Sequence, residues 1–382
     1  MRVGCGPLAG TATCADCLRR SWLLAALAPN LDLVWKRRRP LRDVLALPDE
    51  RLIDALGGGE RPALLARREA FDAGAALRAC QRAGVEPVCV HDARFPTRLR
   101  TGAGAPRMLH VAGGLARLGM LVGADPQVTI PVVAIVGTRK ASPEGLEMAR
   151  TLGRGLSRAG VTVVSGLALG IDSAAHVGAL EGGGATVTVL AGAAEVAYPR
   201  SKAGLHAQIL AQGCAVSELP PSFEPFRWCF PARNRIIAGL SQLTLVVEGA
   251  ERSGSLITAD FASALGRDVA AVPGRATSPR TRGSNGLIRD GAAVILGVED
   301  VLDAVLGFDR PLDARRTGAQ RPSSLTPALA ALLDAVAGGS DTLAALARTP
   351  AEADAAILGL AELEAQGLLR RSGGGRYVVV AA

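Results

Sequence analysis

The segment VVAIVGTR, residues 132–139, joins five apolar strand formers to a turn of small residues that ends in an arginine. A second segment of this kind, TVVSGLALGID, covers residues 162–172. Each predicts a buried strand, a small-residue turn and a helix, so backbone N–H groups and a helix N-terminus converge where an anion can sit. Two such turns side by side predict a site for a nucleotide or for successive phosphates of a nucleic acid.

The alternation of strand and helix continues after these segments. The expected strands are Val132–Val136, Thr162–Val164, Ala185–Leu190, Ala215–Glu218, Leu243–Glu248, Val269–Val272 and Ala293–Leu296. The expected helices are Glu144–Ala159, Ser173–Leu180, Leu205–Gln212, Asn234–Gly239, Ser255–Leu265 and Ser284–Asp290. Continuous Val-rich strands are covered on both faces, which predicts an α/β fold with a doubly wound, mostly parallel sheet. Ligands of such sheets bind beyond the carboxyl ends of the strands, where both glycine turns fall.

Periodicity and composition divide the chain into four parts. Residues 1–86 show helical spacing between Pro and Gly breaks, which predicts a small helical domain of SAM or helix-hairpin-helix type, or a packing domain without a ligand. Residues 87–308 form the sheet domain and residues 309–324 a polar linker. Residues 325–382 predict three helices and a two-stranded ribbon, which is a winged-helix-like domain. Its second and third helices are acidic, which favours a protein-contact or packing role over reading of a DNA groove.

Length, composition and charge narrow the class of protein. The chain has 382 residues, 49% of them apolar, which is enough for two or three domains. No apolar run reaches the roughly 18 residues of a membrane span, and the N-terminus lacks the pattern of an export signal. We therefore expect a cytoplasmic protein without membrane contact. The net charge of +8 is compatible with a polyanionic partner.

The chain has seven cysteines, an odd number that argues for free thiols rather than a disulfide framework. Cys14 and Cys17 form a C-x-x-C pair; Cys5 precedes it, and Cys89 and His91 follow far downstream. A structural zinc site needs four ligands, which normally come as two such pairs. Because the sequence has one pair, we interpret it as reduced thiols and predict no metal.

The first glycine turn suits a phosphate but no familiar cofactor. Gly137 lets the backbone approach a ligand closely, and Arg139 can bridge phosphate oxygens with two hydrogen bonds. The segment is not G-x-G-x-x-G, and the chain has no G-x-x-x-x-G-K-[ST] motif. We therefore expect neither a dinucleotide cofactor nor ATP hydrolysis of the usual kind.

The second glycine turn offers Ser165, Gly166 and Gly170 as a small polar loop. Asp172 is expected to cap the helix that follows. His176, one helical turn further on, is expected to pack rather than to catalyse, because the sequence names no partner that would orient it. We predict no catalytic residue.

A third candidate segment is FPARNRIIAGLS, residues 230–241. Arg233 and Arg235 flank Asn234 at the expected start of a helix. Cations beside the positive end of a helix dipole cost energy unless an anion is present, so an anion site is favoured. The alternative is that these residues pin the Phe230 loop to neighbouring carbonyls.

Later strands are followed by more polar turns. Residues 251–255, with Gly254 and Ser255, form one, and residues 272–274 and 283–285, the latter with Asn285, form two further ones at sheet edges. Five such turns along one rim of the sheet would build an extended groove.

Five motifs occur in order along the chain: VGTR at 136–139, SGLALGID at 165–172, FPARNRII at 230–237, SGSLITA at 253–259 and GSNGLI at 283–288. This ordered set resembles that of the DNA-processing protein A family, also called Smf. The resemblance covers the central domain, and the expected N-terminal and C-terminal domains agree with the layout of the family.

The resemblance implies a Rossmann-like domain that works as a homodimer, protects incoming single-stranded DNA and loads the RecA recombinase on it during natural transformation. The loop with Tyr198, Arg200 and Lys202 would add stacking and charge. The other residues expected to contact DNA or phosphate are Gly137, Thr138, Arg139, Ser165, Gly166, Gly170, Arg233, Asn234, Arg235, Gly254, Ser255 and Asn285.

Two other functions are compatible with such a sheet. A nucleotide-processing hydrolase of the lysine-decarboxylase-like, phosphoribohydrolase type would share the glycine turns, but residues 251–258 lack the catalytic glutamate of its P-G-G-x-G-T-x-x-E signature. A winged-helix regulator would need a basic recognition helix, which the tail does not supply. We predict a non-enzymatic mediator without a cofactor. Because only 3% of residues are aromatic, phosphate contacts should dominate and binding should depend steeply on salt.

Overall fold

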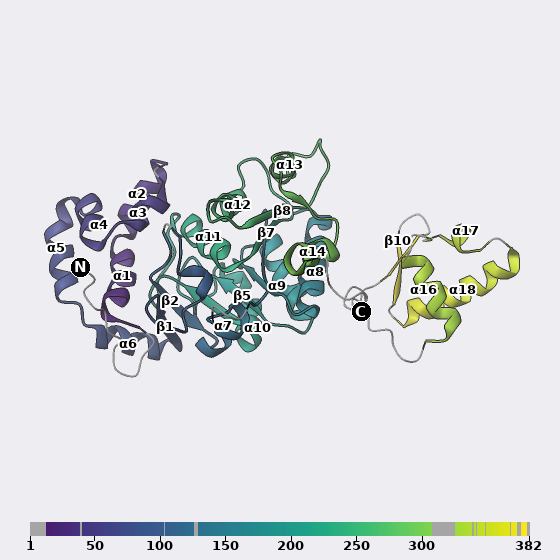
Figure 1. The fold of residues 1–382 in the computed structure, drawn as a ribbon, viewed down its shortest axis with the longest axis horizontal. Helices are drawn as coiled ribbons and strands as arrows, with labels where there is room; N and C mark the ends of the chain where they lie inside the picture. Colours follow the sequence, from purple (N-terminus) through teal and green to yellow (C-terminus); the bar gives the residue numbers. More distant parts are fainter. Residues whose placement is uncertain are drawn as a thin grey trace. The chain divides into compact units, whose positions relative to one another are not determined.

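The computed structural model describes residues 13–38, 40–102, 104–125, 129–307, 325–337, 340, 342–347, 349–366, 368–372 and 376–379. The chain forms two compact units, Met1–Phe308 and Asp309–Ala382 (Figure 1). The helical N-terminal segment belongs to the same unit as the sheet. The linker expected at residues 309–324 lies outside the described residues. Within the described ranges, no helix combines the length and the apolar character needed to cross a membrane.

A nine-stranded sheet forms the centre of the first unit, in the order β1-β2-β6-β5-β4-β3-β7-β8-β9. All neighbours from β6 to β9 along this order are parallel, whereas β2 is antiparallel to both β1 and β6. The expected α/β fold with a mostly parallel sheet is confirmed. The strands are β1 Val85–Cys89, β2 Met108–Ala112, β3 Val132–Val136, β4 Thr162–Ser165, β5 Thr186–Val189, β6 Cys214–Ser217, β7 Leu243–Val246, β8 Asp268–Ala271 and β9 Ala293–Val294.

The two-residue period of the strands explains why both faces of the sheet are covered. Along β3, Val132, Ala134 and Val136 join one apolar core, while Val133 and Ile135 join the other. The first core is closed by α7 Leu115–Val122, α11 Cys229–Leu240 and α12 Gly254–Ala264. The second core is closed by α8 Pro143–Arg158, α9 Ile171–Glu181 and α14 Val298–Leu306. Two further helices, α10 Ala203–Gln212 and α13 Arg282–Arg289, contact β6 and β8.

Neither of the two antiparallel strands, β1 and β2, was expected from the sequence. β1 contains Pro87, which has no N–H to donate, and β1 pairs with β2 alone. Proline is tolerated in an edge strand of this kind because one side of the strand needs no partner. β1 also crosses the position between residues 86 and 87 at which we divided the chain. Helices α7 and α14 were missed as well.

The start of α11 differs from the expectation in a way that matters for the site. This helix begins at Cys229, with Trp228 as its N-cap, and not at Asn234. Arg233 and Arg235 therefore lie beyond the first turn of the helix, where the field of the dipole end is weak. Contrary to the expectation, these arginines need no anion to offset the helix dipole.

The N-terminal helices pack against the sheet unit through a shared apolar core. Leu24, Leu27 and Ile53 from these helices are buried together with Trp228 and Ala232 of the α11 region. Figure 1 shows the helices in purple beside the edge formed by β1 and β2. The segment comprises α1 Ala15–Ala26, α2 Ala28–Lys36, α3 Leu41–Ala46, α4 Asp49–Leu56, the 3-10 turn η1 Gly58–Glu60, α5 Arg61–Glu69 and α6 Ala73–Arg82.

The second unit contains helices followed by a hairpin. Leu329, Leu333, Leu360 and Leu363 form its core. The order of elements is the one expected from the sequence, whereas the winged-helix assignment stays a prediction. The elements are α16 Pro327–Ala337, α17 Leu343–Leu346, α18 Pro350–Ala365 and the antiparallel strands β10 Leu369–Ser372 and β11 Arg376–Val379.

Candidate nucleic-acid interface

A groove of about 660 Å³ opens beyond the carboxyl ends of β3, β4 and β7. β3 lies between β4 and β7 in the sheet. The next strand in the chain, β4, pairs with one side of β3, and the later strand β7 pairs with its other side. Ligands of doubly wound sheets bind at such a switch point. The groove brings together eight of the predicted residues: Gly137, Thr138, Arg139, Tyr198, Arg233, Asn234, Gly254 and Ser255.

A buried glutamate shapes the first glycine turn. The Thr138 N–H donates to the Glu248 carbonyl oxygen at 2.7 Å. The Glu248 carboxylate accepts hydrogen bonds from the backbone N–H and from the hydroxyl of Ser142, each at 2.9 Å. Ser142 in turn caps α8 by accepting from the Gly145 N–H at 3.0 Å. Glu248 therefore fixes residues 137–142, a role that its position at the end of a strand did not reveal in the sequence.

The two glycine turns touch each other. Gly170 has φ +80°, which a side chain would strain, and a Cβ there would lie 2.3 Å from the Thr138 carbonyl oxygen. The Ile171 N–H donates to that same oxygen at 3.3 Å. The sequence prediction that these turns are neighbours is borne out by this contact.

Three side chains form a platform in the groove. The rings of Tyr198 and Phe230 have their centroids 5.4 Å apart, and the Arg139 guanidinium carbon lies 5.2 Å from the Phe230 centroid. Tyr198 is 44% exposed, so its ring can be reached from solvent. We call Arg139, Phe230 and Tyr198 the stacking platform. Phe230 was not predicted as a site residue. Its position in the motif with the arginines, in a chain poor in aromatics, was the available signal.

Exposed cations lie in the stacking platform and beside it. Arg139, Lys140 and Arg227 line the groove and are exposed. None of the three forms an ion pair with another described residue. Trp35, from α2, adds another aromatic side chain to the wall. Charge and aromatic surface therefore meet in one groove, although Lys140, Arg227 and Trp35 were not predicted as site residues.

Arg233 is buried beneath the groove and donates hydrogen bonds to main-chain carbonyl oxygens. Its Nη1 donates to the carbonyl oxygen of Gly166 at 2.6 Å and to that of Val189, and its Nε donates to Asn234 Oδ1 at 3.0 Å. Burial lowers the pKa of Arg233 to about 10, and Asp172, whose carboxylate lies 3.9 Å from Nη2, opposes this shift. Arg233 thus joins the ends of β4 and β5, which favours the pinning alternative for this residue.

The remaining predicted residues lie outside the lining of this groove. The Ser165 hydroxyl donates to the Ile135 carbonyl at 2.6 Å inside the sheet. Arg235 is buried in an ion pair with Glu218, and Asn285 exchanges hydrogen bonds with the backbone of Gly274 at 3.0 Å. Gly166, Gly170, Arg200 and Lys202 complete this set, the last two in the 3-10 turn η3 Arg200–Lys202.

Asp172 and His176 are both buried in α9. Gly170 is the N-cap of α9, so Asp172 lies in the first turn and does not cap it. Burial raises the pKa of Asp172, and the charge of Arg233 opposes this. Thr186 Oγ1 donates to the Val163 carbonyl and accepts from His176 Nδ1 at 2.9 Å. Burial lowers the pKa of His176 to about 3, and this neutral, packed side chain is the one that the sequence analysis expected.

Comparison with known proteins agrees with this architecture. The profile of a protein family described as DNA recombination-mediator protein A matches residues 86–306, which include every strand from β2 to β9 and the whole groove wall contributed by the sheet. This chain belongs to the DNA recombination-mediator protein A family. The family resemblance inferred from the five motifs is therefore confirmed.

Individual members of the DNA recombination-mediator protein A family are similar over part of their length. Protein Smf of Synechocystis is 43% identical over 196 residues, which are 51% of this chain and 49% of that protein. DNA processing protein DprA of Bacillus subtilis is 36% identical over 229 residues, 59% of this chain and 73% of that protein. The match thus spans about half of the Synechocystis relative.

A solved structure extends the comparison to the fold. The X-ray structure of DNA processing protein A from Streptococcus pneumoniae superposes with a TM-score of 0.60 and 31% identity. The superposition covers 76% of this chain and 96% of that chain. The Rossmann-like fold of the family is therefore present here.

Proposed function

We propose that this family member binds single-stranded DNA along the groove and acts as a recombination mediator during natural transformation. The observation that carries the proposal is the stacking platform with exposed cations around it. Single strands are held by aromatic rings that stack on bases and by a positive groove that follows the backbone. In a duplex the bases stack on each other and are not free to stack on the aromatic rings of the protein. A duplex should therefore bind more weakly.

Phosphate contacts should contribute more to the affinity than base stacking does. Arg139, Lys140 and Arg227 give the groove three exposed cations, and each neutralised phosphate releases counterions from the strand. Affinity should therefore fall steeply as salt rises. Base stacking at Tyr198 and Phe230 would add roughly 1 to 3 kcal/mol for each base.

The resemblance to the family supports the rest of the proposal. It includes protection of incoming DNA, loading of the RecA recombinase, a homodimer and a cytoplasmic location, where RecA would be met. It also includes the absence of an enzymatic step. Among the described residues that line the groove, the one carboxylate is Asp172, and its closest cation is the buried Arg233. That arrangement gives the alternative hydrolase no exposed carboxylate to act as a general acid or base.

The test is a fluorescence-anisotropy titration with oligo-dT, the matching duplex and nucleoside monophosphates, at two salt concentrations. Wild type should bind oligo-dT most tightly, and affinity should fall with salt. Arg139→Ala removes a charge-assisted phosphate contact and one member of the stacking platform, so we expect about a tenfold or larger loss of affinity. Tyr198→Leu should weaken binding of oligo-dT but change the salt dependence little, because it removes stacking and no charge.

Arg94→Ala is the matched control. Arg94 is an exposed arginine that pairs with Asp92 and does not line the groove. If Arg94→Ala weakened binding as much as Arg139→Ala, general charge and not the groove would explain the affinity. Binding of a monophosphate in preference to every polymer would contradict the proposal and favour the hydrolase.

The partner and the assembly need separate measurements. We expect the protein to shorten the lag before RecA filaments form on single-stranded DNA coated with single-strand-binding protein. Light scattering coupled to size exclusion should give twice the mass of one chain. An unchanged lag would remove RecA loading from the proposal while leaving DNA binding intact.

A further inference from the structure

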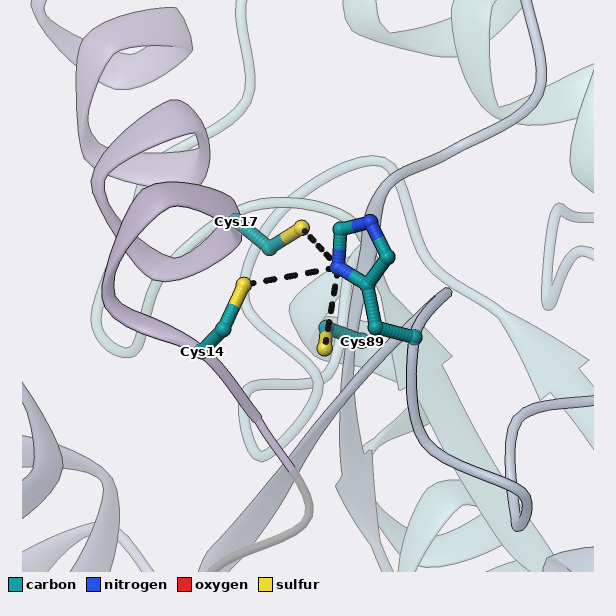
Figure 2. Close-up of side chains that lie close together, drawn as sticks. Cys14, Cys17 and Cys89 are labelled. Carbon is teal, nitrogen blue, oxygen red and sulfur yellow. Dashed lines mark hydrogen bonds between the residues drawn. The ribbon is translucent and has the colours of Figure 1, made fainter. Parts of the chain in front are cut away.

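Four side chains from two distant parts of the sequence meet beside the edge of the sheet. Cys14 and Cys17 come from the start of α1, Cys89 ends β1, and His91 follows in the next turn. Their three sulfur atoms and one ring nitrogen all lie within 4.8 Å of one another. Figure 2 shows the three thiols directed toward a common point. None of the four residues lines the candidate DNA groove.

Hydrogen bonds to His91 alone do not account for this cluster. The Sγ atoms of Cys14 and Cys17 each lie 3.5 Å from His91 Nδ1, and that of Cys89 lies 3.9 Å from it. A ring nitrogen either donates one hydrogen or accepts one hydrogen bond through its lone pair. It can therefore form a good hydrogen bond with one of the three sulfur atoms. The close approach of the other two sulfurs to the same nitrogen is therefore not explained by a hydrogen bond to that nitrogen.

A tetrahedral metal does account for the distances. Zinc bonds of about 2.3 Å to sulfur and about 2.0 Å to nitrogen place a sulfur and a nitrogen ligand roughly 3.5 Å apart at the tetrahedral angle. The same geometry places two sulfurs roughly 3.8 Å apart. The observed sulfur–nitrogen separations of 3.5, 3.5 and 3.9 Å therefore leave room for one ion at the centre.

We propose that Cys14, Cys17, Cys89 and His91 bind one Zn²⁺ as a closed structural site. Three thiolates and one imidazole form one of the usual structural zinc sets, and thiolates favour zinc over magnesium, calcium or manganese. The three cysteines are buried, whereas His91 is exposed and leaves the ion a path of entry. Because four protein ligands fill the tetrahedron, no position is open for catalysis.

The ion would join the N-terminal helices to the sheet. It would tie the first turn of α1 to the end of β1, next to an apolar cluster that includes Leu18, Ala76 and Met108. β1 is an edge strand that pairs with β2 alone, so a bond of this kind would give it a second attachment. The free energy of zinc binding would then contribute to the free energy of folding of the N-terminal segment.

The sequence led us to expect no zinc because it lacks a second C-x-x-C pair. The second half of the site is instead a C-x-H pair, in which His91 lies 74 residues after Cys17. Only the register of β1 beside α1 brings the two halves together. The proposal does not depend on the DNA groove.

The test is the metal content of the full-length protein, purified with a reductant and without a metal-affinity step. We expect about one zinc per chain by mass spectrometry of the metal, and X-ray absorption should show sulfur at about 2.3 Å and nitrogen at about 2.0 Å. Cys17→Ala should lose the zinc. Cys80→Ala is the matched control, because Cys80 is also buried with its Sγ 3.6 Å from a histidine nitrogen, that of His110, but lies outside the cluster.

A second measurement keeps the proposal testable if Cys17→Ala does not fold. Zinc is removed from the wild-type protein and replaced by Co²⁺, which should give the visible absorption of a tetrahedral site together with sulfur-to-cobalt charge-transfer bands. Wild-type protein with no zinc and no tetrahedral cobalt spectrum would overturn the proposal. A Cys14–Cys17 disulfide that persists in reductant, or zinc retained at full level in Cys17→Ala, would overturn it as well.

Discussion

Two arginines have different roles in this site, and the extent of their burial distinguishes them. Arg139 is exposed over the Phe230 ring, whereas Arg233 is buried and donates to main-chain carbonyls. From the sequence we expected both to be phosphate ligands. Arg139 follows the first glycine turn, and Arg233 lies at the expected start of a helix. A guanidinium whose donors are satisfied inside the protein has little left for a phosphate. We therefore expect Arg139 to affect DNA affinity and Arg233 to affect stability.

Replacing Arg233 should destabilise the fold. Arg233→Met leaves Asp172 buried without its cation and leaves the Gly166 carbonyl without its donor. Loss of one partner of a buried pair typically costs about 3 to 5 kcal/mol. Urea unfolding followed by circular dichroism measures this loss. The double variant Arg233→Met with Asp172→Asn should recover part of it; a double variant as unstable as the sum of both single variants would show that the pair is not coupled.

Helices α8 and α9 are positioned by close backbone approach. A Cβ at Gly178 in α9 would lie 2.0 Å from the Arg150 carbonyl oxygen in α8, and one at Gly153 would lie 2.3 Å from the Ala175 carbonyl oxygen. The missing side chains let the two helices pack with their backbones almost in contact. Since α8 follows the first glycine turn and α9 follows the second, this packing also sets the distance between the turns.

Adding one methyl group between these helices should therefore damage both stability and binding. Gly178→Ala forces α8 and α9 apart, and we expect a loss of about 1 to 3 kcal/mol, as for other overpacked sites. Gly204→Ala is the matched control, because Gly204 lies in α10 and a Cβ there meets nothing within 4 Å. That substitution should be neutral or stabilise by up to about 1 kcal/mol. Thermal unfolding of both variants decides the matter, and equal melting temperatures would refute this account of the packing.

On the scale of the whole molecule, buried neutral histidines link stability to pH. Burial lowers the pKa values of His110 and His176 from 6.5 to about 3. Since the folded pKa lies below the unfolded one, the contribution to stability is present above pH 6.5 and is lost as the pH falls from 6.5 toward 3. The Nε2 of His176 has no hydrogen-bond partner among the described residues, so a proton added there would be buried without compensation.

Unfolding in urea at pH 7 and at pH 5 should reveal this linkage. Each histidine should lower the free energy of unfolding by about 2 kcal/mol over that interval. His176→Gln removes one titrating group, so its stability should vary less between the two pH values than that of the wild type. A variant with the same pH dependence as the wild type would show that His176 is already protonated, or solvated, in the folded protein.

Much of the fold was predicted from local sequence pattern, because strands and helices impose a characteristic spacing of apolar residues over short stretches of chain. The apolar run at Val132–Val136 matches β3 residue for residue, and the six later strands lie within two residues of their expected bounds. The antiparallel strands β1 and β2 carry no such signal, since Pro87 interrupts one and a polar His110 lies in the other. Their pairing depends on contacts between distant segments. α11 begins before its expected start at Asn234 and includes Pro231 in its first turn, where a proline is acceptable.

The sequence by itself determined the parallel sheet, the glycine turns and the family, because each depends on residues close together in the chain. The tertiary structure alone decided which of the predicted residues reach the groove. It buried Arg233, Arg235 and Ser165, and it placed Tyr198 beside Phe230. It also brought Cys89 and His91 to the C-x-x-C pair at α1. Burial and contact between distant segments depend on how elements pack against one another, and no local pattern encodes that packing.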